Sequence, residues 1–374
     1  MDVRDVRSSC MKRTREYLVV LNREYIFSSA SIYFESQMKN TDIRKVQKAG
    51  KSTITVSLPK DWITSKGLEP GDRILMHQPP DGTLVITTEA DKKKKVTKKT
   101  LLISETDKEE HIIRKMVGAY LNGYTVLEVK ADKKELMNAR RALRKFTQMV
   151  VGPEIVEESG NRIILNDLSD PMELPQKKCI KRMHFMVDSM HKDAMRAFLE
   201  EDKLIAEDVM DRDRDVDRLY WMVVKQFKMI QIDRSIAEKL DTEPHESAEL
   251  LIVARVLEKI GDHGERIAKR VFENDIPMSE KHLSEISGYH KDALKLLQSA
   301  VTSLFSKDID TANAVIDAVY EKEEGCGFLS KALQQLPDKD TTHKVSVLES
   351  VKSLLEYSAD VAKITINLTI RESE

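Results

Sequence analysis

The chain is poor in cysteine and in aromatic residues: it has three cysteines in 374 residues, and aromatics make up 5% of it. Cys10, Cys179 and Cys326 are far apart and odd in number, which supports neither a disulfide framework nor a thiolate metal site. We therefore expect a reducing, cytoplasmic location. Scarce aromatics beside a charged fraction of 33% favour long amphipathic helices over a β-sandwich.

Long apolar runs are also absent. The most apolar N-terminal stretch, Tyr17 to Leu21, is short and is followed by Asn22, Arg23 and Glu24, so it predicts neither a membrane span nor a signal peptide. Residues 1–37 show no sustained periodicity, and Met38 stands just before a well-patterned segment. We expect residues 1–37 to be a disordered extension or the result of a misassigned start.

Neither sign of charge dominates, because 61 Lys and Arg residues stand against 63 Asp and Glu residues. Any contact with nucleic acid must therefore come from a local basic patch and not from the chain as a whole. The length suits two or three domains with a core in each.

The C-terminal half contains an internal repeat. The stretch HKDAM at His191 returns as HKDAL at His290, and the pair Glu258/Asp262 returns as Glu356/Asp360. The spacing is 99 residues for the first feature and 98 for the second, which predicts two copies of one supersecondary unit. Apolar periodicity and proline breaks predict six helices, near 180–202, 203–236, 245–274, 279–306, 309–336 and 340–371. They form two antiparallel three-helix bundles, which we assign to 171–276 and 277–374.

The segment 38–90 has the pattern of a small β-rich domain. Period-two alternation predicts a strand over 53–58, a short helix from Pro59 that ends before Gly67, and strands over 73–77 and 83–88. A unit this small buries little core alone, so we expect a dimer. KAGKSTITVSLPKDWI at 48–63 and GLEPGD at 67–72 resemble the swapped-hairpin DNA-binding domain of the AbrB/SpoVT family.

That resemblance implies that basic side chains of the strand and turn region contact the DNA duplex. The residues carried over are Arg44, Lys45, Lys48, Lys51 and Lys60. Cationic side chains suit the task because they release condensed counterions from the phosphate backbone. The alternative is a solvated basic edge on a domain that only dimerises.

The middle of the chain shows no sign of catalytic chemistry. The lysine-rich stretch 91–99 has no apolar period and is interpreted as a basic linker. Residues 100–170 predict a small α/β domain with strands near 100–104 and 125–129, helices near 108–121 and 134–150, and a hairpin closed at Gly160-Asn161. This region contains no Gly-rich phosphate loop and no nucleophile elbow, so we assign it a spacing or dimer-support role.

Paired carboxylates are the main candidate chemistry of the helical half. Asp213 falls on the apolar stripe of its helix, and Asp217 at the edge of that stripe. Glu258, Asp262 and Glu265 lie opposite the apolar strip of their own helix, so we expect these three not to be core. Two such pairs on neighbouring helices make a hard oxygen ligand set of the kind that Fe(III), Mg(II) or Mn(II) accepts. Spacing alone leaves another interpretation open, namely acids on a solvated helix that are neutralised by nearby arginines. Those arginines are Arg212, Arg214, Arg218, Arg255 and Arg266.

LEKIGDHGERIA at 257–268 closely resembles the signature helix of PhoU domains, which occur as two three-helix repeats. The family carries multinuclear metal clusters on such Glu/Asp-x-x-x-Asp motifs, with two helices contributing in each repeat. The resemblance implies a first site with four ligands: Asp213, Asp217, Glu258 and Asp262. In the second repeat it offers Glu323, Glu356 and Asp360, but Val319 stands where Asp213 stood, so one ligand is missing.

Three histidines accompany these motifs. We interpret His263 as a packing or capping residue, and His191 and His290 as structural markers of the repeat. No nucleophile, substrate cleft or acid-base pair is identifiable, so we expect no enzymatic activity.

The whole pattern predicts a multidomain α+β protein: a swapped-hairpin domain, an α/β middle region and two PhoU-like three-helix bundles. This combination resembles the archaeal type of phosphate uptake regulator. It implies a dimer that binds promoter DNA of phosphate uptake genes, with iron, magnesium or manganese in a multinuclear cluster. The alternative is a signalling adaptor that dimerises through the hairpin domain and docks on a transporter ATPase or a sensor kinase without binding DNA.

Overall fold

The computed structural model describes residues 42–78, 82–88, 96–273, 280, 282–335 and 340–372. It divides into two compact units, residues 1–96 and 97–374, which are described separately. The predicted extension at 1–37, with Cys10, lies outside the described residues, as do Lys92 to Lys95 of the predicted linker.

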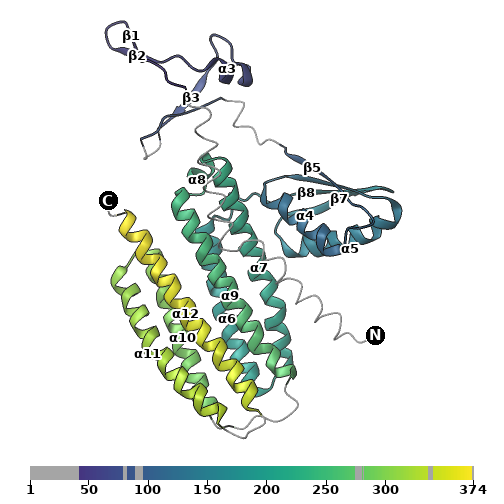
Figure 1. Ribbon diagram of the computed structural model, residues 1–374, viewed down its shortest axis with the longest axis vertical. Coiled ribbons are helices and arrows are strands. Elements are labelled where there is room, and N and C mark those ends of the chain that lie inside the picture. Colours follow the sequence, from purple (N-terminus) through teal and green to yellow (C-terminus); the bar gives the residue numbers. More distant parts are fainter. Residues whose placement is uncertain are drawn as a thin grey trace. The chain divides into compact units, whose positions relative to one another are not determined.

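The first unit consists of two antiparallel hairpins with a short helix between them (Figure 1). Its elements are β1 (Gln47–Ala49), β2 (Thr53–Thr55), α3 (Lys60–Lys66), β3 (Ile74–His77) and β4 (Val85–Thr88). Gly67 ends α3 with φ 62° and ψ 33°, a left-handed conformation that glycine adopts without a steric penalty. The strand predicted over 53–58 is shorter than expected, because β2 ends at Thr55. β1 is an additional strand that pairs with β2.

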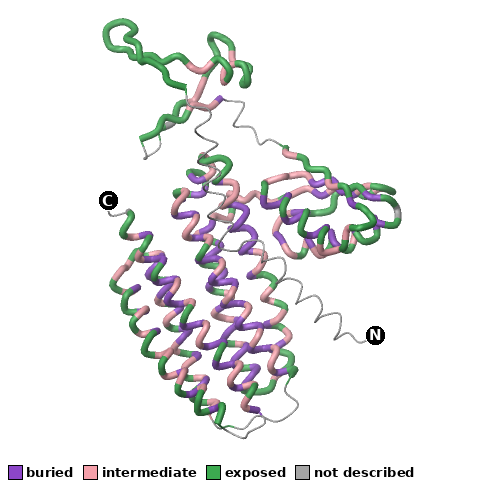
Figure 2. Tube along the Cα trace, in the orientation of Figure 1, coloured by how far each residue is buried: buried purple, intermediate pink, exposed green. Residues whose placement is uncertain are grey.

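This unit has almost no core of its own. Thr88 is the only buried residue among its described positions, while the apolar side chains Ile54 and Met76 are 71% and 59% exposed. In Figure 2 its backbone is mostly in the exposed class, in contrast to the helical part.

The second unit begins with an α/β layer. Its elements are β5 (Lys98–Leu102), α4 (Glu109–Leu121), β6 (Val126–Lys130), α5 (Lys133–Met149), β7 (Pro153–Glu158) and β8 (Arg162–Asp167). The strands form one sheet in the order β5-β6-β8-β7, in which only the β5-β6 pair is parallel. α4 and α5 lie on one face of the sheet (Figure 1) and bury apolar side chains such as Ile112 and Phe146. Lys98 and Lys99 belong to β5, so the linker prediction was wrong for these two residues.

Long helices form the rest of the second unit. They are α6 (Gln176–Glu200), α7 (Lys203–Ile232), α8 (Ser235–Lys239), α9 (Pro244–Glu273), α10 (Leu283–Ser306), α11 (Ile309–Gln334) and α12 (Thr341–Glu372). The six long helices agree with the predicted ranges to within a few residues at each end. The short helix α8 was not predicted, because it occupies a single turn inside the connection from α7 to α9 and has no apolar period to reveal it.

The helices pack as two bundles, α6/α7/α9 and α10/α11/α12, which meet chiefly along α9 and α12 (Figure 1). Both bundles use the same turn between their first two helices. Glu201 and Lys307 adopt the left-handed conformation with φ 55° and 57°. Asp202 and Asp308, which follow them, accept hydrogen bonds from the first-turn amides of α7 and α11. The repeat seen in the sequence therefore extends to the capping geometry.

Buried polar side chains of α7 connect the α/β layer and the segment after it to the first bundle. The ammonium of Lys225 pairs with Asp167 at the end of β8 and lies 4.3 Å from the ring centroid of Tyr120. Gln226 donates through Nε2 to the carbonyl of Leu174 at 2.8 Å. In the described part of the chain no helix is long and apolar enough to cross a bilayer.

Candidate functional site: a carboxylate cluster between two helices

Five acidic side chains gather where α7 packs against α9, and we refer to them as the carboxylate cluster. α7 supplies two of them and α9 the other three: Asp213, Asp217, Glu258, Asp262 and Glu265. Gly261 allows the two helices to approach, because a Cβ at this position would lie 3.0 Å from Oδ1 of Asp213. The structure thus brings together all four residues that were predicted for the first metal site.

Burial and mutual repulsion disfavour the charged form of these acids. The pKa values of Asp213 and Asp217 are raised well above the ordinary range, first by burial and then by neighbouring carboxylates of the cluster. Both side chains are nevertheless only half-buried. Burial, and next the charge of Asp262, also raises the pKa of Glu258. Placing several carboxylates in such a site is costly unless a cation compensates.

Cationic side chains of α9 compensate part of this charge. The ammonium of Lys259 lies 2.6 Å from Oδ2 of Asp262 and 3.4 Å from Oε2 of Glu258. Arg255 donates to the same Oε2 of Glu258 at 3.1 Å, and Lys269 pairs with Glu265. Lys259 therefore bridges two acids of the cluster from within the same helix.

The compensation is incomplete. Oε1 of Glu258 is buried and has no hydrogen-bond partner within the described residues. Within the same described ranges, Asp213 and Asp217 form no hydrogen bond or ion pair. Hard oxygen donors with excess negative charge and one buried oxygen without a partner suit a hard metal cation. However, no three His, Cys, Asp or Glu side chains of the described chain stand in an arrangement that would enclose one metal ion.

The prediction that the α9 acids are not core was wrong for Glu258 and Glu265. Glu258 is 1% exposed and Glu265 is 9% exposed. The reason is that α9 is covered on more than one side, by α6 and α7 of its own bundle and by α12 of the other. Periodicity located the more apolar side of α9, but it did not show that the opposite side would be covered too. Glu265 was also missed as a member of the cluster, although it follows Glu258 by seven residues and so shares its helix face.

The second repeat does not form an equivalent cluster. Val319 is buried in the core, so no carboxylate stands at the place of Asp213. Glu323 is half-buried, and burial followed by the charge of Glu356 raises its pKa. The side chains of Glu356 and Asp360 are about half exposed and pair with neighbouring lysines on α12. These three acids lie near one another, but Glu356 and Asp360 are open to water.

The histidines of the repeat meet at the boundary between the bundles. Nε2 of His191 donates to the carbonyl of Ile260 at 2.7 Å, so Nδ1 of the neutral ring accepts from Nε2 of His290 at 3.2 Å. Both rings are buried, which agrees with a structural role. His263 is also buried and lies 5.9 Å from the ring of Tyr357 on α12, as expected of a packing residue.

The predicted DNA-binding residues lie in the first unit and are exposed. Lys45 precedes β1, Lys48 lies in β1, Lys51 lies in the turn after it, and Lys60 is the first residue of α3. Nε of Arg44 donates to Asp42 at 3.0 Å. Three of the five side chains are thus carried by, or adjacent to, one hairpin.

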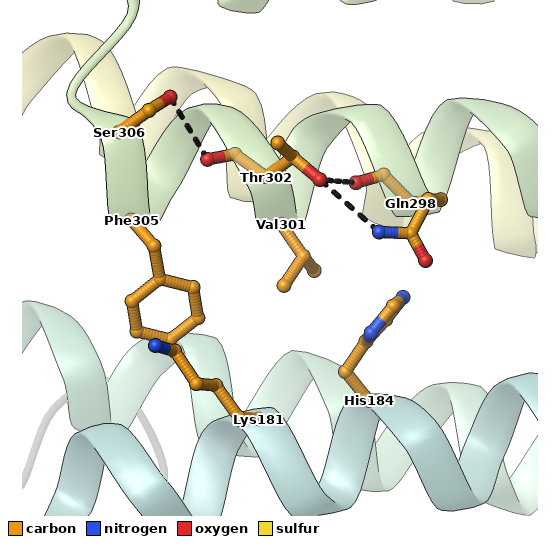
Figure 3. Close-up of a pocket in the computed structure, with 7 residues that line it drawn as sticks. All are labelled: Lys181, His184, Gln298, Val301, Thr302, Phe305 and Ser306. Carbon is orange, nitrogen blue, oxygen red and sulfur yellow. Dashed lines mark hydrogen bonds between the residues drawn. The ribbon is translucent and has the colours of Figure 1, made fainter.

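A groove of about 410 Å³ lies between α6 and α10 (Figure 3). Its lining consists of Lys181, His184, Gln298, Val301, Thr302, Phe305 and Ser306. Thr302 and Ser306 donate their hydroxyl protons to carbonyls of α10, and the ammonium of Lys181 lies 4.5 Å from the ring centroid of Phe305. Among these lining residues there is no Asp, Glu or Cys.

Comparison with known proteins gives two family matches. Residues 180–271, which span the first bundle, match the PhoU domain. Residues 47–97 match the antidote-toxin recognition family MazE of bacterial antitoxins. None of the curated proteins matches this chain.

The solved structures that match include two of PhoU proteins. PhoU from Pseudomonas aeruginosa is 17% identical, and the phosphate transport system regulatory protein PhoU from Streptococcus pneumoniae is 16% identical. Each alignment covers 53% of this chain, together with 96% and 94% of the respective structure, at a TM-score of 0.44. The family matches agree with both resemblances seen in the sequence: the first helical bundle is similar to the PhoU domain, and the segment near the N-terminus is similar to the MazE family.

Proposed function

We propose that this protein is a dimeric, DNA-binding regulator of phosphate uptake. The N-terminal unit binds promoter DNA of phosphate uptake genes, and the helical part senses phosphate status. The observation that carries the proposal is the union in one chain of a MazE/AbrB-like segment at 47–97 with a PhoU domain at 180–271.

DNA binding is supported by the local charge of the first unit. Residues 43–60 contain five basic residues and no Asp or Glu, in a chain whose net charge is −2. Lys45, Lys48, Lys51 and Lys60 have no ion pair with any described residue, so their charge is available to phosphates. Such a patch supplies affinity that falls steeply with salt.

Dimerisation is supported by the missing core of the same unit. Ile54, Met76 and Leu84 are between 58% and 71% exposed. A second copy of the hairpin unit would cover these side chains, which is the usual way in which units of this size complete a core.

Metal binding by the carboxylate cluster is the remaining part of the proposal. The ligands would be Asp213, Asp217, Glu258 and Asp262, with iron, magnesium or manganese as the cation. When bound, the metal supplies the positive charge that the uncompensated acids lack. The buried Oε1 of Glu258 without a partner supports this assignment. The acids of the second repeat are more exposed and lack one ligand, so we assign metal to the first site.

The test is binding of the purified full-length protein to promoter DNA of the phosphate transport operon at several salt concentrations. The variant Lys48→Glu/Lys51→Glu should lose retention by on the order of a hundredfold, because two phosphate contacts become repulsive. The control Lys178→Glu/Lys331→Glu makes the same change in net charge on exposed positions of α6 and α11 and should bind like the wild type.

A wild-type protein that shows no salt-sensitive retention contradicts the DNA-binding proposal. If the Lys48→Glu/Lys51→Glu variant binds promoter DNA as tightly as the wild type, the hairpin is not the DNA-binding surface. A dimer that binds no DNA but captures the transporter ATPase or a sensor kinase would instead establish the adaptor.

A further inference from the structure

The ammonium of Lys259 lies among the acids of the carboxylate cluster. It lies between Glu258 and Asp262, at 3.4 Å and 2.6 Å from their oxygens, and its attraction also partly offsets the raised pKa of Asp217 on the facing helix. One lysine charge thus acts on acids of both α7 and α9.

The remaining polar contacts show why this arrangement stops short of a closed metal site. Arg255 and Lys259 both approach Oε2 of Glu258, while Oε1 of the same carboxylate stays buried without a described partner. Arg255 is held in place, since its guanidinium also lies 5.6 Å from the ring centroid of Tyr220. Lys259 is held by its ion pairs with Glu258 and Asp262, shows no ring contact of the Arg255 kind in the described structure, and carries its ammonium on a flexible four-carbon stem.

We propose that Lys259 is a displaceable internal counter-ion, which neutralises the cluster in the metal-free protein and must swing out when a metal binds. This inference rests on the proposed metal binding and adds a competitor built into the site. It accounts for the coexistence of a metal-like donor set with a geometry that encloses no ion among the described residues. The affinity for metal is then reduced by the free energy of the lysine contacts.

The first experiment compares Mn(II) binding by chelator-treated full-length proteins, measured by calorimetry. Lys259→Met keeps the length of the stem and removes the charge, so it should bind Mn(II) on the order of tenfold more tightly, as expected for loss of a competing half-buried ion pair. Lys259→Arg keeps a cation and should bind no more tightly than the wild type. Lys192→Met removes the 2.7 Å pair with Asp188 on α6 and serves as the matched control with unchanged affinity.

The second experiment follows Lys259 itself by mass spectrometry after brief acetylation. Saturating Mn(II) should increase labelling of Lys259 several-fold, because the released ammonium becomes accessible, and should leave Lys192 unchanged. This measurement remains informative in the wild-type protein if Lys259→Met does not fold.

The outcomes separate the two proposals. If the wild type binds Mn(II) but Lys259→Met binds no more tightly, or if labelling of Lys259 does not rise, the counter-ion inference is wrong and metal binding stands. If neither the wild type nor any variant binds Mn(II), the metal proposal fails and this inference fails with it.

Discussion

At the scale of single residues, the charged forms of Asp213 and Asp217 destabilise the folded protein when no cation compensates them. Their folded-state pKa values are raised, so the folded protein binds protons more readily than the unfolded chain in the acidic range. Their contribution to stability therefore improves as the pH falls through the raised pKa values, and it is least favourable at neutral and alkaline pH.

Asp217→Asn should raise the melting temperature of the metal-free protein at pH 8. The free energy of unfolding should rise by on the order of 1 kcal/mol, because the substitution removes a charge that is disfavoured by burial and by Glu258. The gain should shrink at pH 5, where the wild-type carboxyl takes up a proton more readily. Thermal unfolding in the presence of a chelator measures both values. Asp215→Asn, at an exposed acid of the same helix, is the control, and an equal effect of both variants would count against this interpretation.

Gly264 is a second single-residue feature, since a Cβ there would lie 3.2 Å from Cδ2 of His191. The ring cannot move freely because its two nitrogens are hydrogen-bonded to His290 and Ile260. Gly264→Ala should therefore destabilise the protein, since overpacking costs about 1–3 kcal/mol against roughly 1 kcal/mol gained in helix propensity. Gly118→Ala in α4 has no atom within 4 Å and should be neutral or stabilising. Denaturant unfolding gives the free energy of unfolding of both variants. A Gly264→Ala protein as stable as the wild type would refute the close packing.

At the scale of elements, helix α9 organises the helical part. It supplies three acids to the carboxylate cluster, accepts the hydrogen bond of His191 at Ile260, and contacts both bundles. The boundary between the bundles is therefore continuous with the helix that carries the candidate site.

The histidine contact predicts a loss of stability in acid. Burial lowers the pKa of His191 to about 4, and burial with the nearby His191 lowers that of His290 to about 3. These folded-state pKa values lie below the unfolded value near 6.5, so the unfolded chain takes up protons first. The two histidines therefore reduce the free energy of unfolding as the pH falls from about 6.5 towards 4. His290→Gln keeps a hydrogen-bond donor but cannot titrate, so its stability should depend less on pH in this window. Unfolding curves of the wild type and His290→Gln at several pH values measure this prediction. The contributions of the carboxylates are the same in both proteins and cancel in the difference. Identical pH profiles would contradict the prediction.

The contact between α7 and the α/β layer includes one buried ion pair. Lys225 and Asp167 are both about 95% buried or more, so removing one partner leaves an uncompensated charge. Lys225→Met should cost about 3–5 kcal/mol of unfolding free energy. The double variant Lys225→Met/Asp167→Asn should recover part of this loss, because no lone charge remains. Chemical denaturation of the single and double variants gives the coupling free energy, and strictly additive losses would show that the pair is not coupled.

At the scale of the whole molecule, the two units differ in how they acquire a core. The helical unit buries apolar side chains within one chain, whereas the described hairpin unit leaves Ile54 and Met76 exposed. Ile54→Lys/Met76→Lys should therefore convert the proposed dimer to a monomer without lowering the melting temperature of the helical unit. Light scattering after gel filtration measures the mass. Tyr320→Lys/Phe328→Lys, at exposed aromatic positions on α11, is the control that should stay dimeric. A dimer that survives the first pair of changes would exclude this interface.

The sequence by itself determined the helices and their repetition. Apolar periodicity, the proline that opens α9 and the proline after α11 indicated the long helices, and the pairs Glu258/Asp262 and Glu356/Asp360 revealed the duplication. These features are local, because helix period, capping and chain breaks depend on residues a few positions apart.

Only the tertiary structure decided what those helices bury. It placed Glu258 in the interior, put the ammonium of Lys259 between two acids, and brought His191 into contact with His290 across 99 residues. A single-helix pattern identifies the most apolar face, but it does not reveal that a second bundle will cover the opposite face. The chemistry of the carboxylate cluster follows from the packing of α7 against α9, because burial and the neighbouring carboxylates raise the pKa values of its acids.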